Sequence, residues 1–244
     1  MTIVLITGGT QGVGKATAMA FARQQATVIL NYHSNDLEAH KAVNEIYATT
    51  NVHVELVKAD VTDEAQVIQM INQVISWFGH IDILINNAGI FKDAVSWKMK
   101  KEDWDSVVAT NLTGTFLCTK HVLPYMREKK YGRIINISSV VGQTGAFGTS
   151  NYAASKAGII GFTKAIAREV ALFGITVNCV ALGYIDIGMG LRIPKEVREK
   201  IITQIPMQRF GTVEEVVSTI TFISSNDASY ITGQVIAVNG GYYL

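Results

Sequence analysis

A glycine-rich turn directly after a short apolar run, near the start of the chain, restricts the fold more than any other feature. Residues 3–7 are apolar apart from the last, and glycines follow at Gly8, Gly9, Gly12 and Gly14 before a helical pattern begins. A strand that ends in glycines and opens a helix can bind the pyrophosphate of a dinucleotide, because backbone N–H groups then face the anion. An ordinary glycine-rich turn is the alternative, and the position between strand and helix favours the binding loop.

The rest of the chain repeats this strand-then-helix order. Short β-branched runs predict strands at 3–7, 26–31, 52–58, 81–86, 133–138, 176–182 and 234–239. Longer patterns predict one helix that starts near Gly12 and others at 36–49, 64–77, 101–128, 152–172, 195–204 and 213–224. Continuously apolar strands that alternate with helices pair in parallel and are covered on both faces. We therefore expect one α/β domain over residues 1–244, a doubly wound parallel sheet of the Rossmann type.

Charge and composition narrow the partners. The formal net charge is +1 over 244 residues, so no basic surface for nucleic acid or anionic lipid is expected. No apolar run approaches the roughly 18 residues of a membrane span, and the first apolar run lacks the basic flank of a signal peptide. Cys118 and Cys179 are too few for a disulfide framework. We expect a cytoplasmic protein with two reduced, buried cysteines and no metal site.

Tyr152 and Lys156 stand four residues apart in a helical pattern, so they share one helix face. An ammonium group beside a phenol favours the phenolate, so we expect Lys156 to lower the pKa of Tyr152 and to make it a general acid or base. A surface pair without function has the same spacing. Ser138 and Ser139 lie at the end of the preceding strand, where parallel sheets form their ligand crevice. Either hydroxyl could stabilise charge on a substrate oxygen, and the pattern alone does not choose between them.

Over essentially its full length, the chain resembles the short-chain dehydrogenase/reductase family. The resemblance rests on the loop from Thr7 to Gly14, on the motif Asn86-Asn87-Ala88-Gly89, and on the positions of a catalytic tetrad: Asn111, Ser139, Tyr152 and Lys156. Tyr152 follows Ser139 by 13 residues, the usual family spacing, which selects Ser139 over Ser138. The family transfers hydride between a nicotinamide dinucleotide and a carbonyl or alcohol.

The resemblance implies a role for each tetrad residue. Tyr152 would protonate the carbonyl oxygen, Ser139 would polarise it, and Lys156 would hold the ribose hydroxyls and lower the pKa of Tyr152. Asn111 would hold a water in a proton relay, or it would simply cap a helix kink. Asp60 and Val61 would contact the adenine, although an N-cap formed by Thr62 or Asp63 is the alternative explanation.

The residues expected around the cofactor come from every strand end that would reach it. They are Gly8, Thr10, Gln11, Gly12, Val13, Gly14, Asn31, Tyr32, His33, Ser34, Asp60, Val61, Asn87, Ala88, Gly89, Tyr152, Lys156, Gly183 and Ile185.

The stretch 181–189 departs from the family pattern at two positions. Leu182 replaces a proline, and Ile187 replaces the threonine that bonds the nicotinamide amide, so that hydroxyl is missing. Gly188 and Gly190 favour a mobile lid over the substrate.

The tip of the second predicted strand bears on the choice of cofactor. NAD-selective enzymes of this fold place an acid there to hold the ribose 2′-OH. This chain has Tyr32 instead, followed by the neutral donors His33, Ser34 and Asn35, so we expect a preference for NADPH. The nearby Asp36 and the lack of Lys or Arg in this loop argue for NADH.

Local similarity points to 3-oxoacyl-acyl-carrier-protein reductases and to the related acetoacetyl-CoA reductases. Phe147 and Tyr184, together with Ser139 and Tyr152, would contact the substrate, and the two aromatic residues resemble the apolar wall of the coenzyme A enzymes. Phe173 stands where carrier-protein-dependent enzymes often have arginine. The resemblance implies NADPH-dependent reduction of a 3-oxoacyl thioester carried by acyl carrier protein. The alternatives are an acetoacetyl-CoA reductase, an NAD-dependent polyol or steroid dehydrogenase, and an inactive scaffold.

The predicted helices 101–128 and 152–172 carry more apolar residues than one buried face needs. In the resembling family these helices pair between subunits. We therefore expect a homotetramer, with the last strand and the tail from Tyr242 to Leu244 forming a second interface.

Overall fold

Seven parallel strands form one sheet in a computed structural model that describes residues 1–188 and 190–244. The strands are β1 (Ile3–Ile6), β2 (Thr27–Tyr32), β3 (Glu55–Lys58), β4 (Ile83–Asn86), β5 (Gly132–Ser139), β6 (Ile175–Leu182) and β7 (Val235–Val238). Their order across the sheet is β3-β2-β1-β4-β5-β6-β7. The chain therefore runs outward in one direction from β1 to β3 and in the other from β4 to β7, and the reversal between β1 and β4 opens a crevice at the carboxyl ends of the strands.

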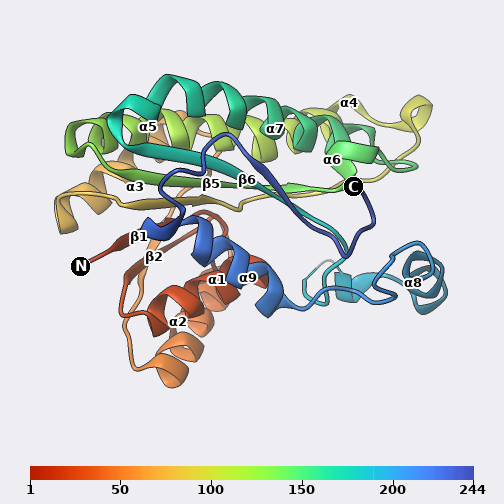
Figure 1. Ribbon diagram of the computed structural model, residues 1–244, viewed down its shortest axis with the longest axis horizontal. Coiled ribbons are helices and arrows are strands. Elements are labelled where there is room, and N and C mark those ends of the chain that lie inside the picture. The colour runs from red at the N-terminus through yellow and green to blue at the C-terminus, as the bar shows by residue number, and fades with distance from the viewer. Residues whose placement is uncertain (189) are drawn as a thin grey trace.

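Helices cover both faces of this sheet (Figure 1). They are α1 (Gly12–Arg23), α2 (Asp36–Thr50), α3 (Glu64–Phe78), α4 (Lys101–Val108), α5 (Gly114–Lys129), α6 (Val141–Thr144), α7 (Ser150–Val170), α8 (Lys195–Ile202) and α9 (Val213–Ile223). One core, with Leu5, Val122 and Val177, lies between the sheet and α3, α5 and α7. The other, with Phe21 and Ile220, lies between the sheet and α1, α2 and α9. The predicted doubly wound α/β fold is confirmed.

The chain between Lys101 and Lys129 differs from the single helix expected there. A π-helical turn, η2 (Ala109–Thr113), separates α4 from α5 and contains the fully buried Asn111. The short helix α6 and the 3-10 turns η1 (Ser96–Lys98), η3 (Ala171–Phe173), η4 (Gly190–Arg192) and η5 (Asn226–Ala228) were also not predicted. These segments are shorter than the stretch over which an apolar period becomes recognisable.

Among the described residues, three α-helices begin with a side-chain cap. Asn35 accepts a hydrogen bond from the backbone of Glu38 at the start of α2, Asp63 caps α3, and Thr212 forms a capping box with Glu215 at α9. At α1, the N-cap residue Gln11 makes no such bond to any described atom. The first amides of α1 are therefore left for another partner.

Cys118 and Cys179 are free and buried, as predicted. Within residues 1–188 and 190–244, no helix combines the length and the apolar character needed to cross a membrane.

Candidate active site

The loop between β1 and α1 depends on glycines at three positions. Gly8 and Gly12 have φ angles of +58° and +54°, which L side chains rarely adopt. No described atom lies within 4 Å of the position that a Cβ of Gly12 would take, so the space above the helix start is open. A Cβ at Gly14 would instead lie 2.6 Å from both Asn87 Nδ2 and the Gly8 carbonyl oxygen. The loop is thus open toward the crevice and tightly packed beneath.

The segment after β4 fixes this loop. The Thr7 hydroxyl oxygen accepts hydrogen bonds from the backbone N–H groups of Asn87 and Ala88, both at 3.0 Å. The Asn87 amide donates to the carbonyl oxygens of Thr7 and Gly8, at 3.1 and 2.9 Å. A Cβ at Gly89 would lie 3.6 Å from Lys156 Nζ, so this segment connects the glycine loop to a predicted catalytic residue.

These features fit a dinucleotide pyrophosphate. The uncapped amides of α1 and the positive end of its helix dipole attract an anion. No acidic residue stands in the first turn of α1 to repel it. Of the other predicted loop residues, Thr10 is buried and Gln11 is exposed, while Val13 packs partly against the core beneath α1.

Asn31, predicted to contact the cofactor, supports the loop from beneath instead. It is buried, its Oδ1 accepts from Gly8 N at 3.3 Å, and its Nδ2 donates to the Ala59 carbonyl at 2.9 Å. The side-chain amide therefore spends its hydrogen bonds on contacts from β2 to the glycine loop and to the residue that follows β3. The structure therefore corrects this assignment.

The side chains of Asp60 and Val61 are also occupied by contacts within the protein. Asp60 Oδ1 accepts from the backbone N–H and the hydroxyl of Thr62, at 2.9 and 2.8 Å, and Asp60 Oδ2 lies 3.5 Å from His33 Nε2. The Val61 side chain packs into the core against Gly114. Any contact of Val61 with adenine must use its backbone. Asp63, not Thr62, caps α3.

Lys58 is a residue near the adenosine end that we did not predict. It stands opposite Tyr32 in the β2–β3 register, and its Nζ lies 2.9 Å from Asp36 Oδ1. The loop after β2 contains no Lys or Arg, and the sequence does not reveal which residue of β3 pairs with the end of β2. His33 and Ser34 are exposed beside it.

The predicted catalytic residues Ser139, Tyr152 and Lys156 lie together at the carboxyl end of β5. Ser139 ends this strand, and its hydroxyl faces the phenol of the half-buried Tyr152 and lowers its pKa. Lys156 is buried, and its Nζ lies 5.6 Å from the centre of the Tyr152 ring. Ser138 points elsewhere: its hydroxyl donates to the Lys156 carbonyl oxygen at 2.8 Å. The alternation of side chains along β5 thus brings Ser139, rather than Ser138, to Tyr152.

The pKa of Tyr152 moves opposite to our expectation. Burial raises it to about 12 against the opposing hydrogen bond from Ser139, and the negative charge of nearby Asp93 raises it slightly further. Burial also lowers the pKa of Lys156 to about 8, and the ammonium donates to the Ile137 carbonyl oxygen at 2.7 Å. Desolvation of the phenol is therefore the largest influence on the pKa of Tyr152, in place of the lysine that we expected to lower it.

Asn111 joins three segments from within the π-helical turn. Its Oδ1 accepts from Ile90 N at 2.8 Å, and its Nδ2 donates to the Ile90 carbonyl at 3.0 Å and to the Ser155 hydroxyl at 3.1 Å. With its side chain so occupied, Asn111 positions the segment beside Gly89. The water that the resemblance places at Asn111 stays a prediction.

The segment after β6 approaches the glycine loop. A Cβ at Gly188 would lie 3.7 Å from Gly12 Cα, so the two backbones face each other across the crevice. Gly183 donates to the Val238 carbonyl, and the Ile185 side chain is buried in the core, which leaves only its backbone for a cofactor. Leu182 and Ile187 pack against the same core. Met189, within the expected lid, lies outside the described residues, and the mobility of the lid stays a prediction.

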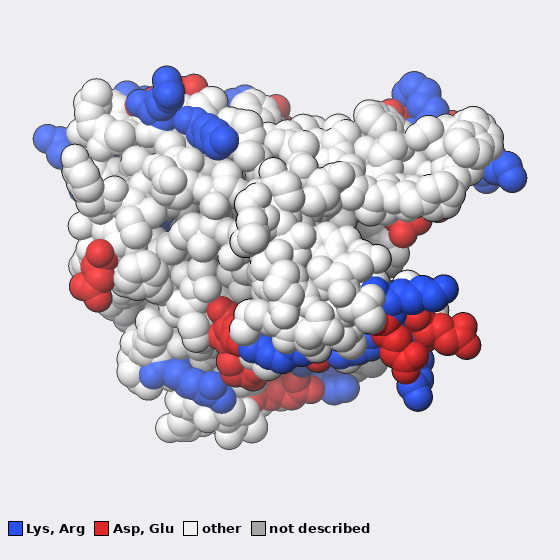
Figure 2. Space-filling model, turned by 45° about the vertical axis from the view of Figure 1, so that its right-hand side comes forward, with Lys and Arg blue, Asp and Glu red and all other residues white. Residues whose placement is uncertain are grey.

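The two aromatic residues predicted to contact substrate have different surroundings. Phe147 is 89% exposed on the loop before α7, where Gly148 accepts a hydrogen bond from Ala94 N. Tyr184 stacks on Phe210 with ring centres 5.4 Å apart and meets Tyr242 edge-on. The segments around α4 and α8 project beyond the sheet in Figure 1, and Figure 2 shows a hollow between two projections on that side.

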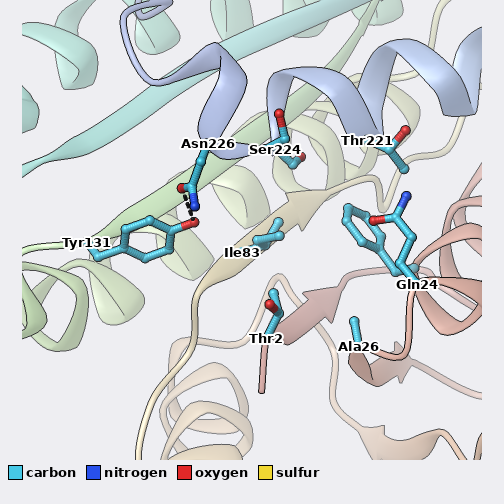
Figure 3. Close-up of a pocket in the computed structure, with 10 residues that line it drawn as sticks. Thr2, Gln24, Ala26, Ile83, Tyr131, Thr221, Ser224 and Asn226 are labelled. Carbon is cyan, nitrogen blue, oxygen red and sulfur yellow. Dashed lines mark hydrogen bonds between the residues drawn. The ribbon is translucent and has the colours of Figure 1, made fainter.

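A separate cavity of about 150 Å³ lies at the amino ends of the strands, opposite the crevice (Figure 3). Thr2, Ile83 and Tyr131 line it near the starts of β1, β4 and β5, and the Tyr131 hydroxyl donates to Asn226 Oδ1 at 3.2 Å. Because ligands of this fold bind at the carboxyl ends of the strands, this cavity is not part of the candidate active site.

Comparison with known proteins agrees with this geometry. A family model described as enoyl-(acyl carrier protein) reductase matches residues 8–243. The 3-oxoacyl-[acyl-carrier-protein] reductase FabG of Staphylococcus aureus strain Mu50 is 44% identical over 240 residues, which cover 98% of this chain and 97% of the relative. FabG of Thermotoga maritima is 45% identical over 242 residues, 99% of this chain and 98% of the relative. A 3-oxoacyl-[acyl-carrier-protein] reductase of Synechocystis is 45% identical over 243 residues, 99% and 97%.

Proposed function

The chain belongs to the short-chain dehydrogenase/reductase family, and we propose that it reduces 3-oxoacyl thioesters to 3-hydroxyacyl thioesters with NADPH. It is an NAD(P)-dependent oxidoreductase. The observation that carries the proposal is the meeting of Ser139, Tyr152 and Lys156 beside a glycine loop that fits a dinucleotide. The names of full-length relatives supply the substrate class.

The reaction adds a hydride to the carbonyl carbon and a proton to its oxygen. The reduced nicotinamide, when bound, supplies the hydride. Tyr152 gives up the proton, and the Ser139 hydroxyl donates a hydrogen bond to the same oxygen as negative charge develops there. A pKa of about 12 keeps Tyr152 protonated at neutral pH, which is the form that reduction requires. The reverse oxidation would start from the phenolate.

Lys156 and Asn111 hold this arrangement together. The Lys156 ammonium lies near the Tyr152 ring and close to Gly89, where it would hold the ribose hydroxyls. Asn111 is a positioning residue, because its amide fixes Ile90 and Ser155 relative to η2.

The carrier of the acyl group can be decided kinetically. The names of the relatives favour acyl carrier protein, whereas Phe173, at the end of η3, offers no positive charge to an acidic carrier protein. The test is kcat/KM for acetoacetyl groups on acyl carrier protein and on coenzyme A. A preference of about tenfold for coenzyme A, or ~1.4 kcal/mol, would make acetoacetyl-CoA reductase the better description. Activity on a sugar or steroid alone would refute the thioester proposal.

The proposed NADPH preference rests on the end of β2, where Tyr32 takes the place of the acid that holds the ribose of NAD. The free, buried state of Cys118 and Cys179 supports a reducing, cytoplasmic location. The single sheet that runs from Ile3 to Val238 supports one domain over the whole chain.

The outer face of α5 and α7 supports one subunit interface of the homotetramer that we propose. A groove of about 590 Å³ lies between these helices, and Phe116, Phe162 and Ile166 line it. Leu172, at its edge, is 84% exposed. An apolar groove of this kind is typical of subunit interfaces. Light scattering at micromolar concentration should give the tetramer mass, and a monomer mass would contradict the proposal.

A further inference from the structure

Three side chains meet at the outer corner of the cofactor crevice. Lys58 Nζ lies 2.9 and 3.2 Å from the two carboxylate oxygens of Asp36, and 5.9 Å from the centre of the Tyr32 ring. Tyr32 and Lys58 are opposite each other in the β2–β3 register. The side chains of Lys58 and Asp36 are 51% and 59% exposed, so a ligand can reach both.

The corner is joined to the glycine loop by backbone contacts. Gly9 N donates to the Asn31 carbonyl at 3.0 Å, and Ala59 N donates to the Tyr32 carbonyl at 2.9 Å. The end of β2 is therefore fixed beside the loop that fits the pyrophosphate. In this fold the residue at the end of β2 faces the adenosine ribose, where NADPH carries a phosphate and NADH a hydroxyl.

We propose that Lys58 selects the 2′-phosphate of NADPH, and that Asp36 holds the Lys58 ammonium until the phosphate replaces it. The inference rests on the proposed NADPH-dependent function and adds the residue that would confer the preference. An exposed ion pair contributes little to stability, so a phosphate of nearly two negative charges displaces Asp36 easily. The pairing lowers the pKa of Asp36 and raises the pKa of Lys58, so both groups are charged at neutral pH.

The same three residues allow an opposite assignment. Asp36 could accept a hydrogen bond from the ribose 2′-OH of NADH, and Lys58 would then only neutralise it. The two assignments predict opposite effects of removing each charge. In our proposal, Asp36 competes with the phosphate; in the alternative, Asp36 is the ligand.

The experiment is calorimetric titration of the full-length protein with NADP⁺ and with NAD⁺. Lys58→Gln should weaken NADP⁺ binding at least about tenfold and change NAD⁺ binding less than about twofold, because a charge-assisted contact is lost only with the phosphate. Asp36→Asn should tighten NADP⁺ binding several-fold, since the competitor and the repulsion are both removed. Lys101→Gln is the matched control, because Lys101 forms a similar exposed pair with Asp105 on α4, and it should change neither affinity.

An unchanged ratio of the two affinities in Lys58→Gln would overturn the proposal, as would weaker NAD⁺ binding in Asp36→Asn. If Lys58→Gln does not fold, the proposal is tested with Lys58→Arg and Asp36→Asn instead. Lys58→Arg should keep the NADP⁺ affinity within about threefold because it keeps the charge, and Asp36→Asn should tighten NADP⁺ binding several-fold as above. Titration with adenosine 2′,5′-bisphosphate and 5′-AMP isolates the phosphate from the nicotinamide. A wild-type protein that binds NADP⁺ through Lys58 but reduces no 3-oxoacyl thioester would contradict the proposed function and leave this inference standing.

Discussion

Replacing Lys156 with methionine should stabilise the cofactor-free protein while it abolishes activity. The buried ammonium has a pKa of about 8 against an ordinary 10.5, which corresponds to a penalty of about 3 kcal/mol at neutral pH. The lost hydrogen bond to the Ile137 carbonyl offsets about 1 kcal/mol of this. The expected net gain in the free energy of unfolding at pH 7 is about 2 kcal/mol, or a Tm higher by roughly 4–8 °C. Such a gain at the expense of function is common for strained active sites.

The pH dependence of this gain tests its cause. Because the pKa of Lys156 in the folded state lies below that in the unfolded state, the wild type loses its penalty as pH rises from about 8 to 10.5. The advantage of Lys156→Met should therefore shrink to about 1 kcal/mol at pH 9. Urea denaturation at pH 7 and pH 9, followed by circular dichroism, measures both values. Lys164→Met, at an exposed position of the same helix, is the control and should stay within about 0.5 kcal/mol of the wild type. A Lys156→Met protein less stable than the wild type at pH 7 would refute the reasoning.

Three further predictions concern the site. Tyr152→Phe should lower kcat at least ~10²-fold with the circular dichroism spectrum unchanged, and a variant that keeps half of the turnover would exclude Tyr152 as the acid. Gly14→Ala should abolish dinucleotide binding in calorimetry, because its Cβ would lie 2.6 Å from Asn87 Nδ2, whereas Gly161→Ala, with no described atom within 4 Å, should bind normally; equal binding by both would contradict the packing argument. Finally, kcat/KM for reduction should fall as pH rises through about 8, where free Lys156 loses its proton, and a profile flat to pH 10 would show that this titration does not matter.

The fold could be predicted because its signals are local. Most strands are short and rich in β-branched apolar residues, and the β-to-α junctions carry polar or glycine residues, so the order of elements follows from the sequence. The residues at which the strands begin and end were predicted less accurately. We expected the third strand from residue 52, but β3 begins at Glu55, where its pairing with Ile29 of β2 begins. That limit is set by a neighbouring strand, not by the residues before Glu55.

The site was predictable to the extent that its residues belong to contiguous motifs. The glycine loop and the Tyr152–Lys156 pair each lie within one short segment, and the structure brings them to one end of the sheet. Lys58 was missed because its importance comes from strand register. The direction of the Tyr152 pKa was wrong because residue spacing gives the distance to a charge but not the degree of desolvation. Asn31 looked available for a ligand because the sequence does not show that its amide is already bonded on both sides.

The π-helical turn η2 makes this part of the chain sensitive to its length. A π turn holds one more residue than an α-helical turn, so it rotates the next helix, α5, by about 100° relative to a regular continuation of α4. The core residues Leu117 and Val122 fix the orientation of α5. Deleting one residue of 109–113 other than Asn111 would therefore turn α4 rather than α5, and would move the Asn111 amide away from Ile90. A change in the number of residues in this turn therefore alters the phase of the whole helix, which a substitution at constant length does not. Evolution within this segment is thus limited to exchanges at constant length.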